Sequence, residues 1–246
     1  MSSKSFRGLS SVLPDAASCE RGVALVVILT AMLFLAALGL ALVLNTSTEA
    51  LVAGNFRSSQ AAFYAAEAGI ERVLPDLRRL ADWSQAFMGL AQSSFVDGPP
   101  EGARPIPGGG EVDLGQVLNL LNCGQPGGCT PAEMDATREG RRWGPNNPRW
   151  ALYGYGPLEG LLPPGAVRSP FYVVVLVADD PAENDNDPTR DGVVPDNPGA
   201  GVLRVRAEVF GSRGARRALE ATVARDRPAG PIQPAAIRLL SWREVR

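Results

Sequence analysis

The sequence predicts an α+β protein in which one long N-terminal helix, first membrane-spanning and then amphipathic, packs on an antiparallel β-sheet. Three observations lead to this prediction. Residues 23–44 form an uncharged apolar run, VALVVILTAMLFLAALGLALVL. The segment that follows has helical apolar periodicity, and several segments after residue 150 alternate as β-strands do.

The apolar run has the length of a transmembrane helix. Its 22 residues would extend about 33 Å as a helix, which is close to the hydrocarbon thickness of a bilayer. Thr30 is its one polar residue, and a helix can satisfy that hydroxyl through a preceding carbonyl. Three basic and two acidic residues precede the run, and Glu49 follows it. The positive-inside rule therefore predicts a cytoplasmic N-terminus and a head outside the membrane.

Two other N-terminal signals match the run poorly. A secretory signal peptide has a shorter apolar core, and the small-residue cleavage site that it needs is missing near Leu44. A lipoprotein signal needs its apolar run before the cysteine, whereas Cys19 stands before the run. We therefore predict a membrane anchor.

After the apolar run, apolar residues recur at helical spacing and form one stripe. Steps of three, four or seven residues place them on one face of a helix. We expect the helix to cover residues 23–83, with a local weakening at residues 45–48 and an end or kink at Pro75. A soluble domain is expected to cover the stripe from its first residue onward. The stripe consists of Val52, Phe56, Phe63, Ala66, Ile70, Val73 and Leu77.

Residues 84–246 predict a β-rich head. Residues 171–177, FYVVVLV, are apolar on both faces and are expected to form a central strand. Residues 203–210 and 216–225 alternate apolar and polar side chains on either side of a glycine-containing turn, which is typical of a hairpin. Further candidates are a strand or short helix at residues 112–121, a strand that begins at Trp150, and a final strand at residues 237–245.

The residues around the apolar run resemble a known family. Arg21-Gly22 precedes the run, and residues 53–57, AGNFR, and 61–68, AAFYAAEA, follow it. This combination resembles the N-terminal domain of PilX-type minor pilins of type IV pili. The last residues, LSWREVR, resemble the end of such chains. The resemblance implies a pilin-like fold.

The resemblance also implies a route of processing and assembly. Residues 1–22 would be a prepilin leader that a prepilin peptidase removes after Gly22, with methylation of the Val23 amine. The subunit would wait in the inner membrane as a single-pass protein with a periplasmic head, and would then enter a cell-surface pilus. Its partners would be other major and minor pilins and the inner-membrane assembly proteins. The helix positions expected to pack in the filament are Val23, Val27, Leu35, Gly39, Phe56 and Phe63.

One position departs from the pattern of major pilins. In those proteins a glutamate at the fifth mature position is linked to neutralising the N-terminus of an adjacent subunit. Here the fifth residue after Gly22 is Val27, and the first acid is Glu49. A carboxylate in lipid is costly unless it is paired. A subunit without it is expected at or near the filament tip, where it would prime or cap assembly; a merely divergent anchor is the alternative interpretation.

Cleavage after Gly22 would remove Cys19 and leave Cys123 and Cys129, which the turn-forming residues GQPGG separate. Thiols outside the cytoplasm tend to be oxidised, so we predict a disulfide between them. Two reduced, buried cysteines are the alternative. A zinc site is not expected, because two thiolates without His do not complete a ligand set.

Residues 179–200 form a strongly acidic loop, with seven acids and one arginine. Hard oxygen ligands at this density suit Ca²⁺. The spacing is not that of an EF-hand, because Pro188 stands where a glycine would follow Asp187. A solvated acidic surface is the alternative. The candidate calcium ligands are Glu183, Asp185, Asp187 and Asp191.

Composition excludes several classes of function. The chain has no His, which removes His-based catalytic triads and His metal ligands. A net charge of −2 gives no basic footprint for nucleic acid. We therefore expect a structural minor pilin that is not an enzyme and has no cofactor other than Ca²⁺. The alternatives are a K-type minor pseudopilin of a type II secretion system and a membrane-tethered extracytoplasmic hydrolase.

Overall fold

Two compact units make up the chain, Met1–Asn55 and Phe56–Arg246. The computed structural model of the protein describes residues 17–161, 168–183, 185–191, 201–226 and 236–245. Helix α1, Ala17–Arg79, contributes residues to both units. Residues 1–16, which make up most of the predicted leader, lie outside the described part.

The second unit is built on a five-stranded antiparallel sheet in the order β3-β4-β5-β6-β7. Strands that follow one another in sequence are neighbours in the sheet, so the chain runs as a meander. A long helix packed on an antiparallel sheet is the α+β architecture that the sequence predicts, and this prediction is confirmed. The strands are β3 Ala151–Pro157, β4 Tyr172–Asp179, β5 Val202–Phe210, β6 Arg216–Arg225 and β7 Ile237–Val245.

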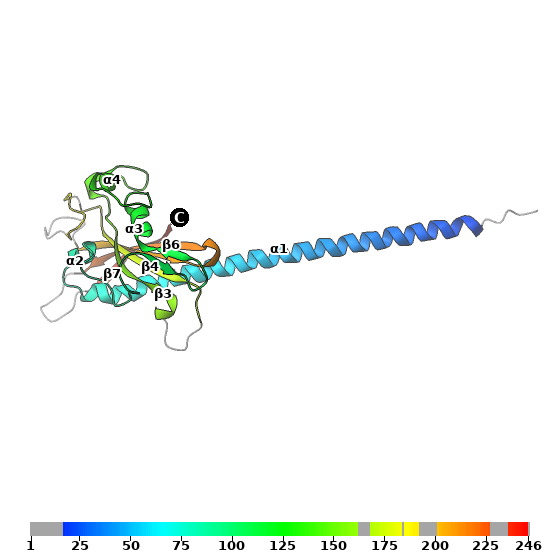
Figure 1. Cartoon of the computed structure of the whole chain (residues 1–246), viewed down its shortest axis with the longest axis horizontal. Helices are drawn as coiled ribbons and strands as arrows, with labels where there is room; N and C mark the ends of the chain where they lie inside the picture. The colour runs from blue at the N-terminus through cyan, green and yellow to red at the C-terminus, as the bar shows by residue number, and fades with distance from the viewer. Residues whose placement is uncertain (1–16, 162–167, 184, 192–200, 227–235, 246) are drawn as a thin grey trace, which may run out of the picture. The chain divides into compact units, whose positions relative to one another are not determined.

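The C-terminal part of α1 covers one face of this sheet (Figure 1). Its buried residues meet the inward side chains of the central strands, such as Val175, Val205 and Ala221. A small side chain is essential where the helix crosses β4, because a Cβ atom added at Gly69 would lie 2.7 Å from Val173 Cγ1. The buried α1 residues are Ala62, Ala65, Ala66, Gly69, Ile70, Val73 and Leu77.

A second apolar core covers the opposite face of the sheet. Val112, Leu114 and Val117 pack there against residues of β4 that alternate with those facing α1, among them Val174 and Leu176. These residues come from a short hairpin and from helix α3, which begins where the Asp113 carboxylate accepts a hydrogen bond from the Gln116 N–H at 2.8 Å. Both faces of the sheet are therefore buried.

Short elements complete the head. The hairpin consists of β1, Ala103–Pro105, and β2, Glu111–Asp113. The helices are α2 Ser84–Phe87, α3 Leu114–Asn122 and α4 Pro131–Asp135, with 3₁₀ turns at Gly144–Asn146, Leu158–Leu161 and Ser212–Gly214.

The predicted helix differs from α1 at its C-terminal end. Helix α1 runs through Pro75 and ends at Arg79, so it stops four residues before the predicted residue 83. Two side chains satisfy the carbonyl groups there. The Trp83 Nε1–H donates to the Leu77 carbonyl at 2.9 Å, and the Arg225 guanidinium donates to the carbonyls of Leu80 and Ala81 at 2.7 and 2.6 Å.

Coverage of the apolar stripe also starts later than predicted. Val52 and Phe56 are 63% and 64% exposed, whereas Ala62 is 1% exposed. The periodicity of the stripe is that of α1 throughout, but the sheet reaches only its second half. Where the sheet ends is decided by strand length and register, which the helix sequence does not contain.

The close approach at Gly69 gives a test of the fold. We expect Gly69→Leu to lower the melting temperature of the full chain in detergent by roughly 5–10 °C, because a large side chain would overpack the contact with Val173 and Val175. Gly54→Leu is the matched control, since a Cβ atom added there meets nothing within 4 Å. Equal melting temperatures for the two variants would contradict the packing described.

Candidate assembly surface and cavities of the head

The N-terminal part of α1 presents apolar side chains to its surroundings. The large apolar residues from Val23 to Val52 are each 49–74% exposed. Within the described residues, α1 is the one helix that is long and apolar enough to cross a membrane, and its most apolar window is not buried. This segment therefore has the properties of a single-pass membrane anchor.

Polar residues within this helix satisfy their own hydroxyl groups. The Thr30 hydroxyl donates to the Val26 carbonyl at 2.9 Å, as expected from the sequence. Ser47 and Thr48 donate to carbonyls four residues earlier at 2.8 and 3.0 Å. Residues 45–48 are helical, so α1 is not interrupted at this point; the predicted local weakening stays a prediction.

The predicted processing and packing positions lie on the exposed part of the helix. Gly22 and Gly39 have no atom within 4 Å of an added Cβ, so the backbone there is open to close approach by a neighbour. Exposed fractions are 64% for Val23, 59% for Val27, 68% for Leu35 and 64% for Phe56.

Phe63 differs from the other predicted packing positions. It is partly buried and packs against the core formed by α1 and the sheet. Its ring also meets the neighbouring Tyr64 ring edge-on, with 5.7 Å between the centroids. Part of its side chain therefore packs in the head, and its role in filament packing stays a prediction.

Cys123 and Cys129 form a disulfide, with their Cα atoms 5.7 Å apart. Helix α3 ends at Asn122 and α4 begins at Pro131, so the bridge closes the turn between these two helices. In the chain-entropy model a ring of this size stabilises the fold by about 2 kcal/mol.

The carboxylates of the acidic loop mainly close local turns. Asp185 Oδ1 accepts from the Asp187 N–H at 2.9 Å, and Asp187 Oδ1 accepts from the Thr189 hydroxyl at 2.6 Å. Asp191 Oδ1 accepts from the Gly201 N–H at 2.7 Å, and Glu183 is 1% exposed. Among the described residues, no three Asp, Glu, Cys or His side chains gather closely enough to hold a metal ion. Calcium binding stays a prediction.

Asp179, the first acid of the predicted loop, is buried and was not among the candidate calcium ligands. It ends β4, is 3% exposed, and its Oδ1 has no hydrogen-bond partner among the residues that the structure describes. Burial, together with the nearby Glu183 carboxylate, raises the pKa of Asp179 to about 9. Asp179 therefore carries a proton at neutral pH.

The N-terminal region matches a known family. Residues 21–71 match the family model described as PilX N-terminal. The N-terminal region of the chain is therefore similar to that of PilX-type pilins. It covers about a fifth of the sequence and includes the whole apolar run. No curated protein and no solved structure matches the chain.

The match agrees with the exposed apolar helix. PilX-type proteins are minor pilins of type IV pili, and pilins are in general structural proteins that associate with other pilins and the pilus machinery. Residues 21–71 include the exposed part of α1 and the first residues that pack on the sheet. The matched region is therefore both the anchor and the start of the head.

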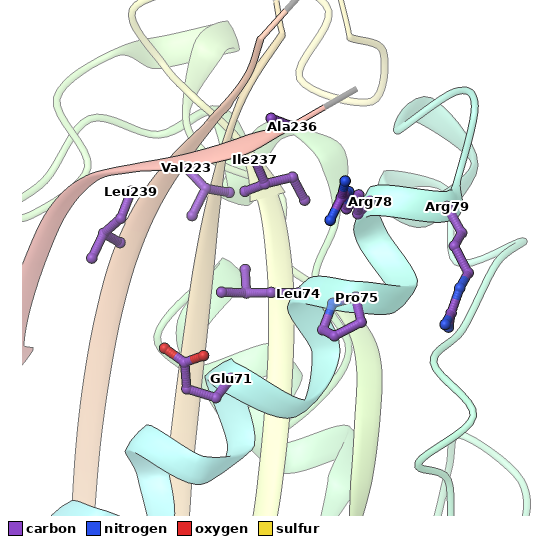
Figure 2. A pocket seen from close by; sticks show the side chains of 9 residues that line it. All are labelled: Glu71, Leu74, Pro75, Arg78, Arg79, Val223, Ala236, Ile237 and Leu239. Atoms are coloured by element: carbon purple, nitrogen blue, oxygen red, sulfur yellow. The ribbon is translucent and has the colours of Figure 1, made fainter. Parts of the chain in front are cut away.

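An apolar hollow of about 640 Å³ lies between α1 and the edge of the sheet. Figure 2 shows Leu74 facing Val223, Ile237 and Leu239 across it, with Arg78 at one side. Strand β7 is the edge of the sheet, and Leu239 is 52% exposed. The hollow therefore continues into an exposed apolar strip along the strand.

A second cavity, of about 480 Å³, lies at the outer face of β5 and β6 and is lined by arginines. Sequence analysis missed this site. The alternation in residues 203–210 places Arg204 and Arg206 on the face opposite the apolar residues, but it does not show what covers that face. In the structure both side chains are 12% exposed, because α3 and the segment after it cover that face.

The raised pKa of Asp179 gives a stability test in the head. The pKa of Asp179 in the folded protein, about 9, lies above the ordinary value of 3.8. The protonated acid therefore makes its full contribution to the stability of the fold below about pH 4, and this contribution is lost as the pH rises towards 9. We expect Asp179→Asn to raise the melting temperature by roughly 3–8 °C at pH 8 and to leave it unchanged at pH 4.

Asp180→Asn, at the partly exposed neighbouring position, serves as the control and should shift the melting temperature little at either pH. A destabilised Asp179→Asn variant at pH 8 would contradict the raised pKa of Asp179.

The same melting curves with EDTA and then Ca²⁺ test the calcium hypothesis. A melting temperature that EDTA lowers and Ca²⁺ restores would support that hypothesis, and one that neither reagent changes would count against it.

Proposed function

We propose that this chain is a minor pilin that takes part in type IV pilus assembly, and that it primes or caps the filament near its tip. The observation that carries the proposal is the apolar helix of residues 23–44, which is exposed along its length and lies within the PilX N-terminal match. Such a surface needs lipid or other helices around it.

The exposed helix suits both stages of pilus assembly. Before assembly its apolar side chains would contact lipid, and in the filament they would contact the helices of other pilins. Gly39 is suited to such contacts, because the absence of a side chain lets two helices approach closely. The head would then lie in the periplasm, and later on the cell surface, as the end of a single-pass inner-membrane protein.

The proposed position near the tip depends on the missing acid. Val27 occupies the position where major pilins carry a glutamate, and residues 23–44 contain no charge. A subunit below the tip has a neighbour above it whose N-terminal amine would need a carboxylate in an apolar environment. A subunit that offers no such carboxylate is best accommodated where no neighbour is stacked above it.

The proposed activity is assembly rather than catalysis. It requires helix packing by α1 and contacts by the head. The sequence has no His. Its partners would be other major and minor pilins, the prepilin peptidase and the inner-membrane assembly proteins.

Processing of the leader tests the pilin assignment. We expect the mature protein to begin at Val23 with a methylated amine when it is made in cells that contain a prepilin peptidase. N-terminal mass spectrometry measures both changes. Gly22→Val should retain the leader because the peptidase needs a small residue before the cut, whereas Gly39→Val should be processed normally. An intact leader on the unaltered protein, made in cells that contain a prepilin peptidase, would contradict the proposal that the chain is a pilin.

The position of the subunit can be tested on purified filaments. We expect gold-labelled antibodies against the head to mark filament ends. Val27→Glu supplies the missing carboxylate and should move part of the label into the shaft, whereas Val26→Glu on the neighbouring position should not. Label along the shaft for the unaltered protein would contradict the tip position.

A deletion strain that keeps its pili but loses protein secretion would favour the pseudopilin alternative.

A further inference from the structure

The arginine-lined cavity of the head has a strong excess of positive charge. Its walls include five arginines, Arg138, Arg141, Arg204, Arg206 and Arg243, against two glutamates, Glu139 and Glu220, which leaves a net charge of +3. The chain as a whole has a net charge of −2, so this concentration does not reflect the average composition.

Three of the arginines share a single carboxylate. Glu220 pairs with Arg204, with Arg243 at 2.8 Å and with Arg206 at 3.6 Å. Burial opposes the ionisation of Glu220, but the surrounding guanidinium groups hold its pKa below the ordinary value. One negative charge cannot neutralise three positive charges. Glu208 does not remove the excess, because this carboxylate binds Arg206 at 2.7 Å and also Arg216 at 3.1 Å.

Arg141 carries a charge without a carboxylate partner among the described ion pairs. It is 6% exposed and donates to the backbone carbonyls of Pro148 and Met134, each at 2.8 Å. Its Nε–H is buried and has no hydrogen-bond partner in the described part of the chain. Burial and neighbouring positive charges lower the pKa of Arg141 to about 10. A buried, uncompensated charge is costly, so an anion in this cavity would relieve the cost.

Neighbouring groups fix several of these arginines in place. The Arg204 guanidinium lies over the rings of Trp150 and Trp143, at 5.7 and 6.0 Å from their centroids. Arg138 donates to the carbonyl of Cys123, at the end of α3 and beside the disulfide. These contacts hold the side chains before any ligand arrives, which reduces the entropy lost on binding.

We propose that this cavity binds a phosphate group, either free or as an ester on a larger molecule. Arginine is the preferred residue for oxyanions, since its planar guanidinium donates two parallel hydrogen bonds to their oxygens. The excess of three charges suits a phosphate, which has up to two charges near neutral pH, better than a single carboxylate. The volume of about 480 Å³ accommodates a group of this size together with part of its attached molecule.

Calorimetric titration of the full chain in detergent tests the site. We expect saturable binding of inorganic phosphate and at least tenfold weaker binding of acetate at the same ionic strength. Arg243→Ala should weaken phosphate binding at least fivefold. Arg238→Ala is the matched control, because Arg238 lies on the same strand but outside the cavity and is similarly exposed, at 65% against 60%. Its affinity should stay within twofold of the unaltered protein.

A variant that is expected to tighten binding shows whether the loss of affinity in Arg243→Ala reflects the site rather than misfolding. Glu139 lines the cavity and is exposed, so Glu139→Gln should leave the fold intact and tighten phosphate binding about two- to threefold. Glycerol 3-phosphate distinguishes the sources: binding as tight as that of phosphate indicates an esterified group, and binding of phosphate alone indicates the free ion. Absence of phosphate binding, or equal affinities for Arg243→Ala and Arg238→Ala, would overturn the proposal.

Discussion

The head depends on close contact between the small-residue face of α1 and the central strands of the sheet. Ala62, Ala65, Ala66 and Gly69 bring the helix backbone near β4 and β5, and the larger Ile70, Val73 and Leu77 then fill the core further along. Because burial of apolar surface is the main favourable term in folding, this contact orders the sheet as well as the helix. Strands β4, β5 and β6 present their inward residues to it.

The opposite face of the sheet has a different balance of forces. At β4 it is apolar and is covered by α3 and the β1–β2 hairpin. At β5 and β6 it carries charged residues, of which Glu208 and Glu220 are almost fully buried. Arginines from both strands surround these carboxylates, so each buried negative charge is paired. The pairing leaves more arginines than acids, and the cavity is the place where the excess collects.

The two halves of α1 suit two different environments. Residues 23–44 have no charge and their large apolar side chains are exposed, whereas the buried α1 residues from Ala62 onward form part of the core of the head. The hydroxyl groups of Thr30, Ser47 and Thr48 bond to carbonyl groups of their own helix, so these hydroxyl groups do not need water. The proposed role in a pilus would use this combination, because the same helix would lie in lipid, pack with other helices and support its head.

The sequence alone predicted the long apolar helix, the family resemblance, the hairpin of residues 203–210 and 216–225, and the disulfide. These are local properties: an uncharged run of membrane length, a motif around Gly22, alternation in residues 203–210 and 216–225, and two cysteines that a glycine-rich turn separates. Only the tertiary structure decided where the sheet begins to cover α1, that Phe63 belongs to the head, and that α1 runs through Pro75 to Arg79. It also decided that Arg138 and Arg141 meet Arg204, Arg206 and Arg243. The physical reason is that burial and charge clustering arise between segments distant in the chain, whereas periodicity reports only one element at a time.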